Sequence, residues 1–506
     1  MDGKQAAQGM SRRGVRNIQR GRRGFLTLMG GTGAALLAAA CSGNSNNTKS
    51  SGAATTAATR AAAATSLSTA AAATAAASPA AVRTTPAAAV AANQTVTYIG
   101  GFDSPPELDW HKQMTADFQA AFPQYKATGT AYGNAAIYTK MQTALASNSP
   151  LDMLWVNNRG LDLAILADQG LLAPVNDVMD DLYKLAGGKD KFDPAAIERY
   201  TTATGDVIGV PAYGSVHVWW YRTDLLQEAG LTPPAGHWDW NFLLQAVKAT
   251  HKPPKVYGLA TALGRNGAVQ WLLGTMILNN GGHMVSPDLK DVVFDSPEVR
   301  QAVDLVKELA QYAPPDATTW GQPELESAIV AGGVAMGEYQ GRVLSDVFTK
   351  NPAILKNIAN TFIPYNKDPR TWGGIGAHGL FKTKNLQAAK ELAKFSMRKD
   401  VFISYLNVLP GTYASAIPAY ASDPTYLSNP VLKAYDPKLV SNITDVSKYA
   451  YDEAKEGPGW KFNPKGGAIE NSLILADIVQ KVTIGKESTA SAVTAGANAI
   501  RDIMKG

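Results

Sequence analysis

Two hydrophobic periods alternate along the chain from about residue 95 onward. Short apolar runs of strand length are separated by longer segments whose apolar residues recur every three or four positions, as on one face of a helix. The runs that predict strands are 96–99, 152–156, 207–211 and 217–221. The segments that predict helices include 110–122, 135–146, 162–171, 386–397 and 488–503. Because strands alternate with helices, we expect an α/β fold.

Local signals refine this pattern. Ser296 followed by Pro297 predicts the start of a long helix, with the serine as N-cap. Val330–Met336 reads as a strand broken by a Gly-Gly turn. Trp155 and Trp271 sit inside apolar patterns, so we expect both in the core.

The first 94 residues have a different pattern. Phe25–Ala40 is a short apolar run that ends in small residues and follows six arginines, which is typical of a signal peptide and too short to span a bilayer. Residues 42–94 are mostly Ala, Thr and Ser with almost no bulky apolar side chains, which predicts a disordered tether or unselected low complexity.

The net charge of +5 does not indicate a nucleic-acid partner. Seven of the 47 basic residues and one of the 42 acids lie within residues 1–40, which leaves 40 basic and 41 acidic residues after them. The export segment therefore accounts for the positive charge, and the rest of the chain carries a net charge of −1.

The single cysteine, Cys41, directly follows the apolar run. A small-residue cleavage site before a cysteine resembles a bacterial lipobox, and the resemblance implies lipidation of Cys41. Gly21-Arg-Arg-Gly-Phe-Leu26 resembles a twin-arginine export signal, carried by Arg22 and Arg23. The alternative is a buried free thiol.

The roughly 410 residues that follow contain a series of short motifs in a recognisable order. They are Tyr138-Thr-Lys-Met-Gln-Thr-Ala-Leu-Ala-Ser-Asn-Ser-Pro-Leu-Asp152, Gly170-Leu-Leu-Ala-Pro-Val-Asn-Asp177, Val218-Trp-Trp-Tyr-Arg-Thr-Asp224, Ala229-Gly-Leu-Thr-Pro-Pro234, Asn280-Gly-Gly282, Asp295-Ser-Pro297, Val334-Ala-Met336 and Lys384-Asn-Leu-Gln-Ala-Ala389. In this order they resemble the extracellular solute-binding proteins of ABC importers, in particular the sugar-binding, maltose-binding-protein-like type.

The resemblance implies a periplasmic-binding-protein-like fold: two α/β lobes joined by a multi-crossover hinge, with a ligand cleft between them. The expected parts are a twin-arginine lipoprotein signal peptide over 1–40, a tether over 41–95, a first lobe from 96–209 and 373–410, and a second from 210–372 and 411–506. Ligand binding would favour closure of the lobes.

Candidate ligand-binding residues are aromatic, amide and charged side chains at predicted loops and strand ends, because sugars need flat apolar faces and hydrogen-bonding groups. Tyr132 and Asn134 are expected in the loop before the helix 135–146, and Glu338, Tyr339 and Arg342 follow Val334–Met336. The full set is Asp103, Tyr132, Asn134, Asn157, Asn158, Tyr213, Glu338, Tyr339, Arg342, Trp372, Gly374, Tyr413 and Trp460. For each one, ordinary packing or surface exposure is the alternative.

Two other kinds of site find little support. Gly374-Ile-Gly-Ala-His-Gly379 matches the spacing G-x-G-x-x-G, but no helix opens from it, so we read it as a hinge and not as a dinucleotide site. The chain has no H-x-x-x-H, C-x-x-C, G-x-S-x-G or Walker motif, and we expect no metal, cofactor or catalytic residue.

The sequence thus predicts a non-enzymatic, monomeric receptor, lipid-anchored on the outer face of the cell membrane, that delivers a sugar or glycoside to ABC permease subunits. One alternative is a different solute, such as an oligopeptide, a polyamine or a phosphate ester. The other is a secreted carbohydrate-active enzyme, since the separation of its acidic residues cannot be measured from sequence.

Overall fold

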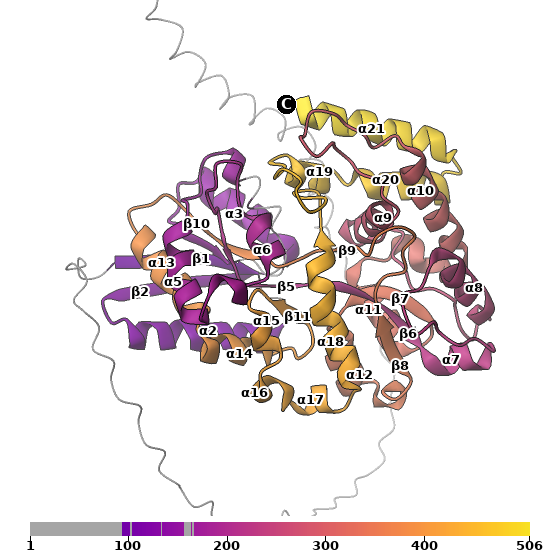
Figure 1. Ribbon diagram of the computed structural model, residues 1–506, viewed down its shortest axis with the longest axis horizontal. Helices are drawn as coiled ribbons and strands as arrows, with labels where there is room; N and C mark the ends of the chain where they lie inside the picture. Colours follow the sequence, from indigo (N-terminus) through magenta and orange to yellow (C-terminus); the bar gives the residue numbers. More distant parts are fainter. Residues whose placement is uncertain (1–93, 102–103, 133, 156–162, 164–165, 506) are drawn as a thin grey trace, which may run out of the picture. The chain divides into compact units, whose positions relative to one another are not determined.

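The computed structural model describes residues 94–101, 104–132, 134–155, 163 and 166–505 (Figure 1). Cys41, Arg22, Arg23 and the predicted tether lie outside these residues, as do Asp103, Asn157 and Asn158. Among the described residues, no helix is both long and apolar enough to cross a bilayer.

The first of two main sheets has five strands in the order β2-β1-β3-β10-β4. Its strands are β1 (Gln94–Gly101), β2 (Tyr125–Tyr132), β3 (Met153–Trp155), β4 (Val210–Pro211) and β10 (Ala377–Leu380). β1 runs parallel to β2 and β3, whereas β10 runs antiparallel to β3 and β4. The predicted strands 96–99 and 152–156 are confirmed over their described residues.

The second sheet has three antiparallel strands in the order β7-β6-β8. They are β6 (His217–Arg222), β7 (Met336–Gln340) and β8 (Ile358–Thr361). β6 carries Val218, Trp219 and Trp220, all fully buried, as expected for β-branched and aromatic residues in a central strand. The predicted strand 217–221 is confirmed.

Two small ribbons lie on the segments that connect the sheets. β5 (Tyr213–Ser215) pairs with β11 (Tyr413–Ser415), and β9 (Thr371–Trp372) pairs with β12 (Ala450–Tyr451). The chain therefore passes between the sheets after β4 and returns between β9 and β10. Since β4 pairs with β10, the first sheet extends two residues past the lobe boundary expected after residue 209.

Glycine is required where these connections meet. A β-carbon on Gly214 would overlap the carbonyl oxygen of Gly374, and Gly374 itself has φ = 133°, which L side chains rarely adopt. The glycines at 373–379 thus serve close backbone approach, as predicted.

Helices pack on both sheets (Figure 1). On or beside the first sheet are α2 (Pro105–Ala121), α3 (Asn134–Ala146), α5 (Asn176–Ala186), α6 (Pro194–Arg199), α13 (Leu386–Ser396), α14 (Lys399–Leu406), α15 (Pro418–Ala421) and α16 (Pro424–Leu427). α2 begins with a capping box at Ser104, where the side chain of Glu107 accepts a hydrogen bond from the backbone of Ser104.

The other helices gather around the second sheet. They are α7 (Thr223–Glu228), α8 (Trp240–Thr250), α9 (Gly267–Asn279), α10 (Pro297–Leu309), α11 (Gln322–Ala331), α12 (Val343–Lys350), α17 (Pro430–Lys433), α18 (Pro437–Val446), α19 (Gly466–Ser472), α20 (Ile474–Thr483) and α21 (Thr489–Lys505). Ser296 caps α10 by accepting a hydrogen bond from the backbone of Val299, as predicted. α9, α10, α20 and α21 lie side by side, as Figure 1 shows.

Three local predictions are wrong. Val330 belongs to the last turn of α11, and Gly332, with φ = 78°, ends that helix, so the strand begins only at Met336. Tyr132 is the last residue of β2, and Asn134 is the first residue of α3, so neither lies in the expected loop. Trp271 is only half-buried, on α9, whereas Trp155 is buried in the core as predicted.

Candidate functional site

A cavity of about 720 Å³ lies between two segments that are far apart in the sequence. One wall comes from residues 167–203, which include α6, and the other from residues 455–464, with Leu289 completing the lining. Trp460, a predicted ligand-binding residue, and Phe462 supply its aromatic surface. We call this space the main cavity. Its volume lies within the range of small-molecule sites, about 300–1,000 Å³.

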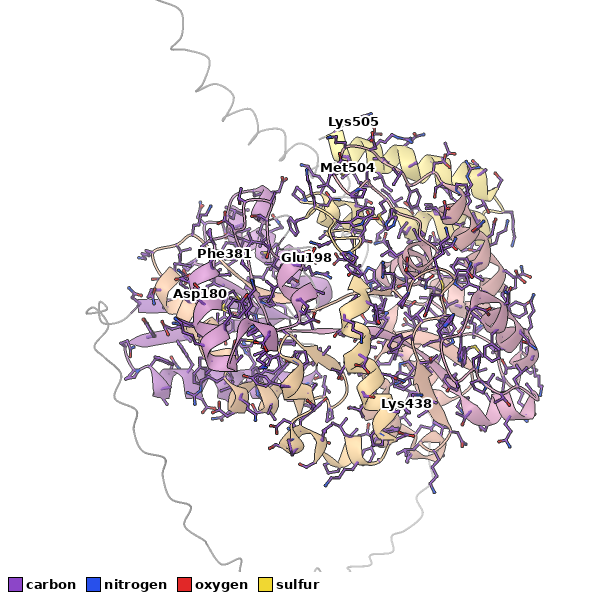
Figure 2. All side chains as sticks on the ribbon, in the orientation of Figure 1. Asp180, Glu198, Phe381, Lys438, Met504 and Lys505 are labelled. Atoms are coloured by element: carbon purple, nitrogen blue, oxygen red, sulfur yellow. The ribbon has the colours of Figure 1, made fainter. Side chains whose placement is uncertain are left out.

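Charged pairs join the two walls of the main cavity. Lys455 contacts Glu198 at 2.7 Å, and the same carboxylate accepts a hydrogen bond from the backbone of Gly459 (3.1 Å). Figure 2 labels Glu198 where α6 meets this segment. Lys465 pairs with Asp168 at 3.2 Å. These contacts hold the two walls of the main cavity together.

A stacked pair of tryptophans lies beside the main cavity. The rings of Trp271 and Trp372 are 5.2 Å apart at 30°. Trp372 comes from β9, on a connection between the sheets, and Trp271 comes from α9. Phe462 packs against the small cluster of Trp372 and Ala454 and also lines the main cavity, so apolar surface continues from Trp372 to the cavity.

Polar side chains surround this tryptophan pair. His217 Nδ1 lies 3.0 Å from Glu338 Oε1, and the edge of the His217 ring meets Trp271 at 4.8 Å. Both His217 and Glu338 are more than nine-tenths buried, and His217 Nε2 and Glu338 Oε2 have no hydrogen-bond partner among the described residues. Together with Trp271 they line a space of about 10 Å³, roughly one water molecule.

Glu453 is a second buried carboxyl group at the pair. It lines a small space together with Trp372. Burial, together with the nearby charge of Glu456, raises the pKa of Glu453 to about 7. Glu338 and Glu453 thus place two buried carboxyl groups beside the aromatic rings, each lining a space of about 10 Å³.

A network of tyrosines lies at the β5–β11 ribbon. Tyr413 donates a hydrogen bond to Glu107 (2.6 Å), Tyr405 donates to the same oxygen (3.2 Å), and Trp155 donates to the hydroxyl of Tyr213 (2.8 Å). Burial raises the pKa of Tyr213, Tyr405 and Tyr413 well above the usual value, so all three stay protonated. The network fixes α2 and α14 to the connections between the sheets.

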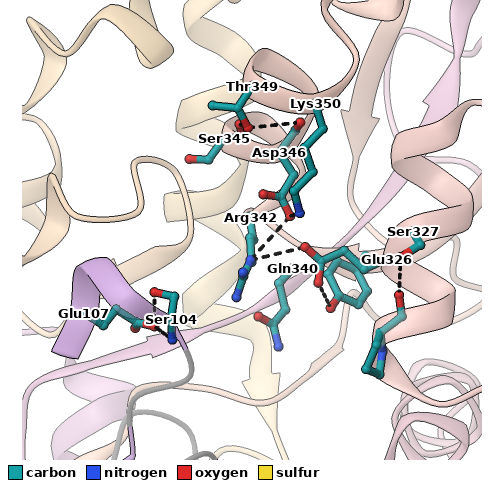
Figure 3. Close-up of polar contacts among 12 residues, drawn as sticks. Ser104, Glu107, Glu326, Ser327, Gln340, Arg342, Ser345, Asp346, Thr349 and Lys350 are labelled. Carbon is teal, nitrogen blue, oxygen red and sulfur yellow. Dashed lines mark hydrogen bonds and ion pairs between the residues drawn. The ribbon is translucent and has the colours of Figure 1, made fainter. Parts of the chain in front are cut away.

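Arg342 lies at the start of α12, between acidic groups (Figure 3). Its Nε is 3.2 Å from Glu326 and 3.4 Å from Asp346, and Glu107 of α2 also acts on it electrostatically. Although burial opposes the charged form, these neighbours raise the pKa of Arg342, so it remains a cation. The guanidinium is about one-quarter exposed and can still be reached.

The structure brings together only part of the predicted ligand-binding set. Trp372 and Glu338 lie at the tryptophan pair, and Trp460 lines the main cavity. Tyr213, Tyr413 and Gly374 belong to the connections between the sheets. Tyr339 is fully buried, with its hydroxyl donating to Glu326 (2.8 Å), and it is not a lining residue of these spaces. Tyr132 ends β2, outside the lining of the main cavity.

Sequence reasoning missed several residues of this region. His217 and Glu453 carry no motif, and Trp271 stands in unremarkable apolar surroundings. The one usable signal was the run 450–463, which includes Phe462 and where three acids and three aromatics occur beside glycines and a proline. No group of three or more metal-ligating side chains was found among the described residues.

Comparison with known proteins identifies the class. Residues 104–401, more than half of the chain, match the model of the bacterial extracellular solute-binding protein family. The chain belongs to this family.

One curated relative is a putative ABC transporter periplasmic-binding protein, YcjN, of Escherichia coli. It is 22% identical over 326 residues, which cover 63% of this chain and 72% of the relative.

Two solved structures show the same two-lobed fold. A sugar transporter from Arthrobacter chlorophenolicus with bound laminaribiose is 22% identical, with a TM-score of 0.67 over 81% of this chain and 99% of the other. An ABC transporter solute-binding protein from Thermotoga lettingae with bound α-D-tagatose is 19% identical, with a TM-score of 0.66 over 82% of this chain and 100% of the other. At these identities the likeness establishes the fold, and the predicted fold class is confirmed.

Proposed function

We propose that this solute-binding protein captures a sugar or glycoside and delivers it to the permease of an ABC importer. The observation that carries the proposal is the stacked pair Trp271–Trp372, with the carboxyl groups of Glu338 and Glu453 beside it. A sugar ring has an apolar CH face that packs on an aromatic ring and hydroxyl groups at its edge that donate to carboxylates. Both needs are met at one place next to a cavity of suitable volume.

The solved relatives support the ligand class. Laminaribiose and tagatose are bound in two proteins of the same fold. An oligopeptide, a polyamine and a phosphate ester remain rival ligands. A phosphate ester favours several converging cations, whereas Lys455 and Lys465 at the main cavity are each already paired with an acid.

The arrangement of the lobes follows from the same proposal. We assign the first lobe to 96–211 with 373–427 and the second to 212–372 with 428–506, because β4 pairs with β10 and because α15 and α16 pack on α14, beside the first sheet. The pairs Lys455–Glu198 and Lys465–Asp168 then connect the lobes, and the ligand lies between them.

The cellular setting is also part of the proposal. The export signal with Arg22 and Arg23 takes the chain out of the cytoplasm, and a lipid on Cys41 holds it at the outer face of the membrane. Residues 42–94 supply the tether between the anchor and the two lobes. The receptor acts as a monomer without cofactor or catalysis, and its partners are the sugar and the permease subunits.

A thermal-shift screen of the full chain against mono-, di- and oligosaccharides tests the ligand class. A true ligand at 100 times its Kd should stabilise the folded state by about 2.7 kcal/mol. Absence of a shift with every sugar, together with a shift from a peptide, polyamine or phosphate ester, would replace the sugar by that class.

Incubation with glycans separates the receptor from the enzyme alternative. We expect the ligand to be recovered unchanged after prolonged incubation. Product formation that disappears in Glu338→Gln or Glu453→Gln would show a carbohydrate-active enzyme instead.

A further inference from the structure

A second cavity, of about 300 Å³, shares no lining residue with the main cavity or with the small spaces at the tryptophan pair. We call it the outer pocket. Its walls come from the loop 234–238, from β6 and β8 at Tyr221 and Asn360–Phe362, from Tyr365, and from α18 at Lys438 and Asn442. The volume is at the lower end of the range for small-molecule sites.

Aromatic rings form much of the outer pocket and are fixed in pairs. His237 stacks on Tyr365 with ring centres 4.3 Å apart at 21°, and Tyr221 packs on Trp238 at 4.7 Å. The backbone of Tyr365 donates to the carbonyl of Trp238 (3.0 Å), which joins the loop 234–238 to the segment after β8. The rings therefore form a wall held by both stacking and main-chain hydrogen bonds.

An ordered pair of amides forms the opposite part. Asn442 Nδ2 donates to both the side-chain oxygen (2.9 Å) and the backbone oxygen (3.2 Å) of Asn360. Asn360 is 5% exposed, and its own Nδ2 donates to Leu439 O (3.0 Å). These bonds fix the Asn442 side chain with its Oδ1 left over as an acceptor.

Several polar atoms of the lining are uncommitted. Among the described residues, Tyr221 Oη, Thr361 Oγ1, Tyr365 Oη and Asn442 Oδ1 make no hydrogen bond, and none of them is a buried atom. Lys438 is the sole lysine or arginine of the lining, and no Asp or Glu lines it. The outer pocket thus offers hydroxyls and an amide oxygen beside ring faces, without a carboxylate to attract a cation.

We propose that the outer pocket is a second saccharide site that takes one or two sugar rings. Ring faces pack against the CH face of a sugar, while hydroxyl and amide groups that can both donate and accept match its hydroxyls. A purely apolar ligand would leave the four uncommitted polar atoms without water, which costs free energy. The site is independent of the cleft, so it does not rest on the proposed transport function.

Its affinity is expected to be modest. A ligand of one or two rings held by a small partly open pocket should bind with a Kd between about 10 µM and 1 mM. Saturation-transfer difference NMR is suited to this range, and we would use the full chain with glucose, galactose, maltose and cellobiose as probes.

The decisive comparison is made in the Trp271→Ala background, which weakens the proposed cleft site and leaves the outer pocket untouched. We expect at least one probe to retain its saturation transfer in this background and to lose it when Tyr365→Ala or Asn442→Ala is added. Asn442 is a half-buried surface residue of α18, so Asn442→Ala should fold normally, which circular dichroism can verify.

Tyr312→Ala is the matched control. Tyr312 is also a half-buried tyrosine packed on a histidine, with its ring 5.3 Å from that of His251, but it lies outside the outer pocket. Saturation transfer should survive this change. Signals that vanish with Trp271→Ala alone, or that persist in both Tyr365→Ala and Asn442→Ala, would overturn the second site. The single variants separate the two sites. If Tyr365→Ala or Asn442→Ala alone abolishes all saturation transfer, whereas Trp271→Ala alone leaves it unchanged, the outer pocket is supported and the cleft does not bind these sugars.

Discussion

The partial exposure of Trp271 decides whether this residue can serve only packing or can also contact a ligand. A fully buried tryptophan contributes packing alone, whereas the half-buried Trp271, stacked on Trp372, keeps surface for the ligand contact proposed above. The helical pattern of α9 does not distinguish the two cases, because the whole helix is apolar and its neighbours are buried. The exposure of Trp271 depends on how α9 lies beside β9, which is a tertiary property.

Replacement of Trp271 tests its contact with the ligand. Trp271→Ala should weaken binding of the best sugar by about 2 kcal/mol, or roughly thirtyfold, because the stacking face is lost. Trp271→Phe keeps an aromatic ring and should lose much less. Isothermal titration calorimetry measures both, and equal affinities for wild type and Trp271→Ala would remove the residue from the site.

Tyr339 is expected to serve stability and not binding. Its ring is fully buried and its hydroxyl donates to Glu326, so Tyr339→Ala should lower the free energy of unfolding by about 3–5 kcal/mol. Tyr339→Phe removes only the hydroxyl and should cost about 1–3 kcal/mol. Urea denaturation gives both values. A large loss of sugar affinity with unchanged stability would instead return Tyr339 to the ligand site.

Glu326 makes stability depend on pH. Burial, followed by a hydrogen bond to Asp346, raises the pKa of Glu326 from 4.5 to about 7. The native state therefore holds a proton that the unfolded chain releases above pH 4.5, and the stability from this group is lost as the pH rises through 7. Asp346 acts in the opposite sense at lower pH, since Glu326 and Arg342 overcome burial and lower its pKa.

Glu326→Gln should therefore flatten the pH dependence. Between pH 5 and pH 8 the wild type should lose on the order of 2–3 kcal/mol through Glu326, and Glu453, whose pKa is also raised to about 7, should add a similar loss. The variant should keep only the Glu453 part. Urea denaturation at both pH values measures this, and identical slopes for wild type and variant would contradict the assignment.

At the scale of elements, the period of the hydrophobic pattern predicted the elements whose apolar face or run is clearest. β1, β3, β6, α2, α10 and α13 all fall where the pattern indicated, because each has one clear apolar face or run. β2 was missed, since Tyr125–Tyr132 is mostly small and polar, and it is a sheet edge paired only with β1. The strand expected at Val330 was wrong because the apolar residues there end α11 before the glycine cap.

The site was less predictable than the elements for a physical reason. Its parts come from α9, β6, β7, β9 and the segment after β12, which no sequence spacing relates. Glu338 and Trp372 are among the predicted residues because aromatic and acidic residues near strand ends are typical of sugar sites. His217 and Glu453 were missed because burial, which makes them notable, is a tertiary property.

The segment 455–465 is the element that should control closure. Lys455 pairs with Glu198. The lysine side chain is 7% exposed and the glutamate side chain 43% exposed, so only the lysine is shielded from solvent. Lys455→Met should weaken sugar binding about threefold to tenfold, because the bound arrangement of the two walls loses a contact and is populated less. The loss should appear mainly as faster dissociation, which stopped-flow fluorescence can follow.

Lys448→Met is the control for this prediction. Lys448 is an exposed lysine a few residues before the same segment; it lies outside the lining of the main cavity and forms no ion pair among the described residues. The change should leave the dissociation rate near the wild-type value. Equal effects of Lys455→Met and Lys448→Met would mean that general charge, and not the contact with Glu198, governs release.

At the scale of the whole molecule, capture and location are separate tasks assigned to separate parts of the chain. The described residues contain the sheets, the cavities and the ion pairs, and the proposed anchor lies outside them at Cys41. Since the first 40 residues carry the excess positive charge, the processed receptor would be nearly neutral. The proposed attachment to the membrane would then depend on a lipid and not on electrostatic attraction.

Cys41→Ala separates these tasks. The variant should leave the membrane fraction and appear in the soluble extracytoplasmic fraction, because the single thiol that could carry a lipid is gone. Its affinity for the best sugar should equal that of the wild type, since no described residue of the cavities is changed. Cell fractionation with immunoblotting measures the first result, and calorimetry on the purified protein measures the second. Ser42→Ala, one position further on, should stay with the membrane; a Cys41→Ala protein that also stays there would show that another part of the chain provides the attachment.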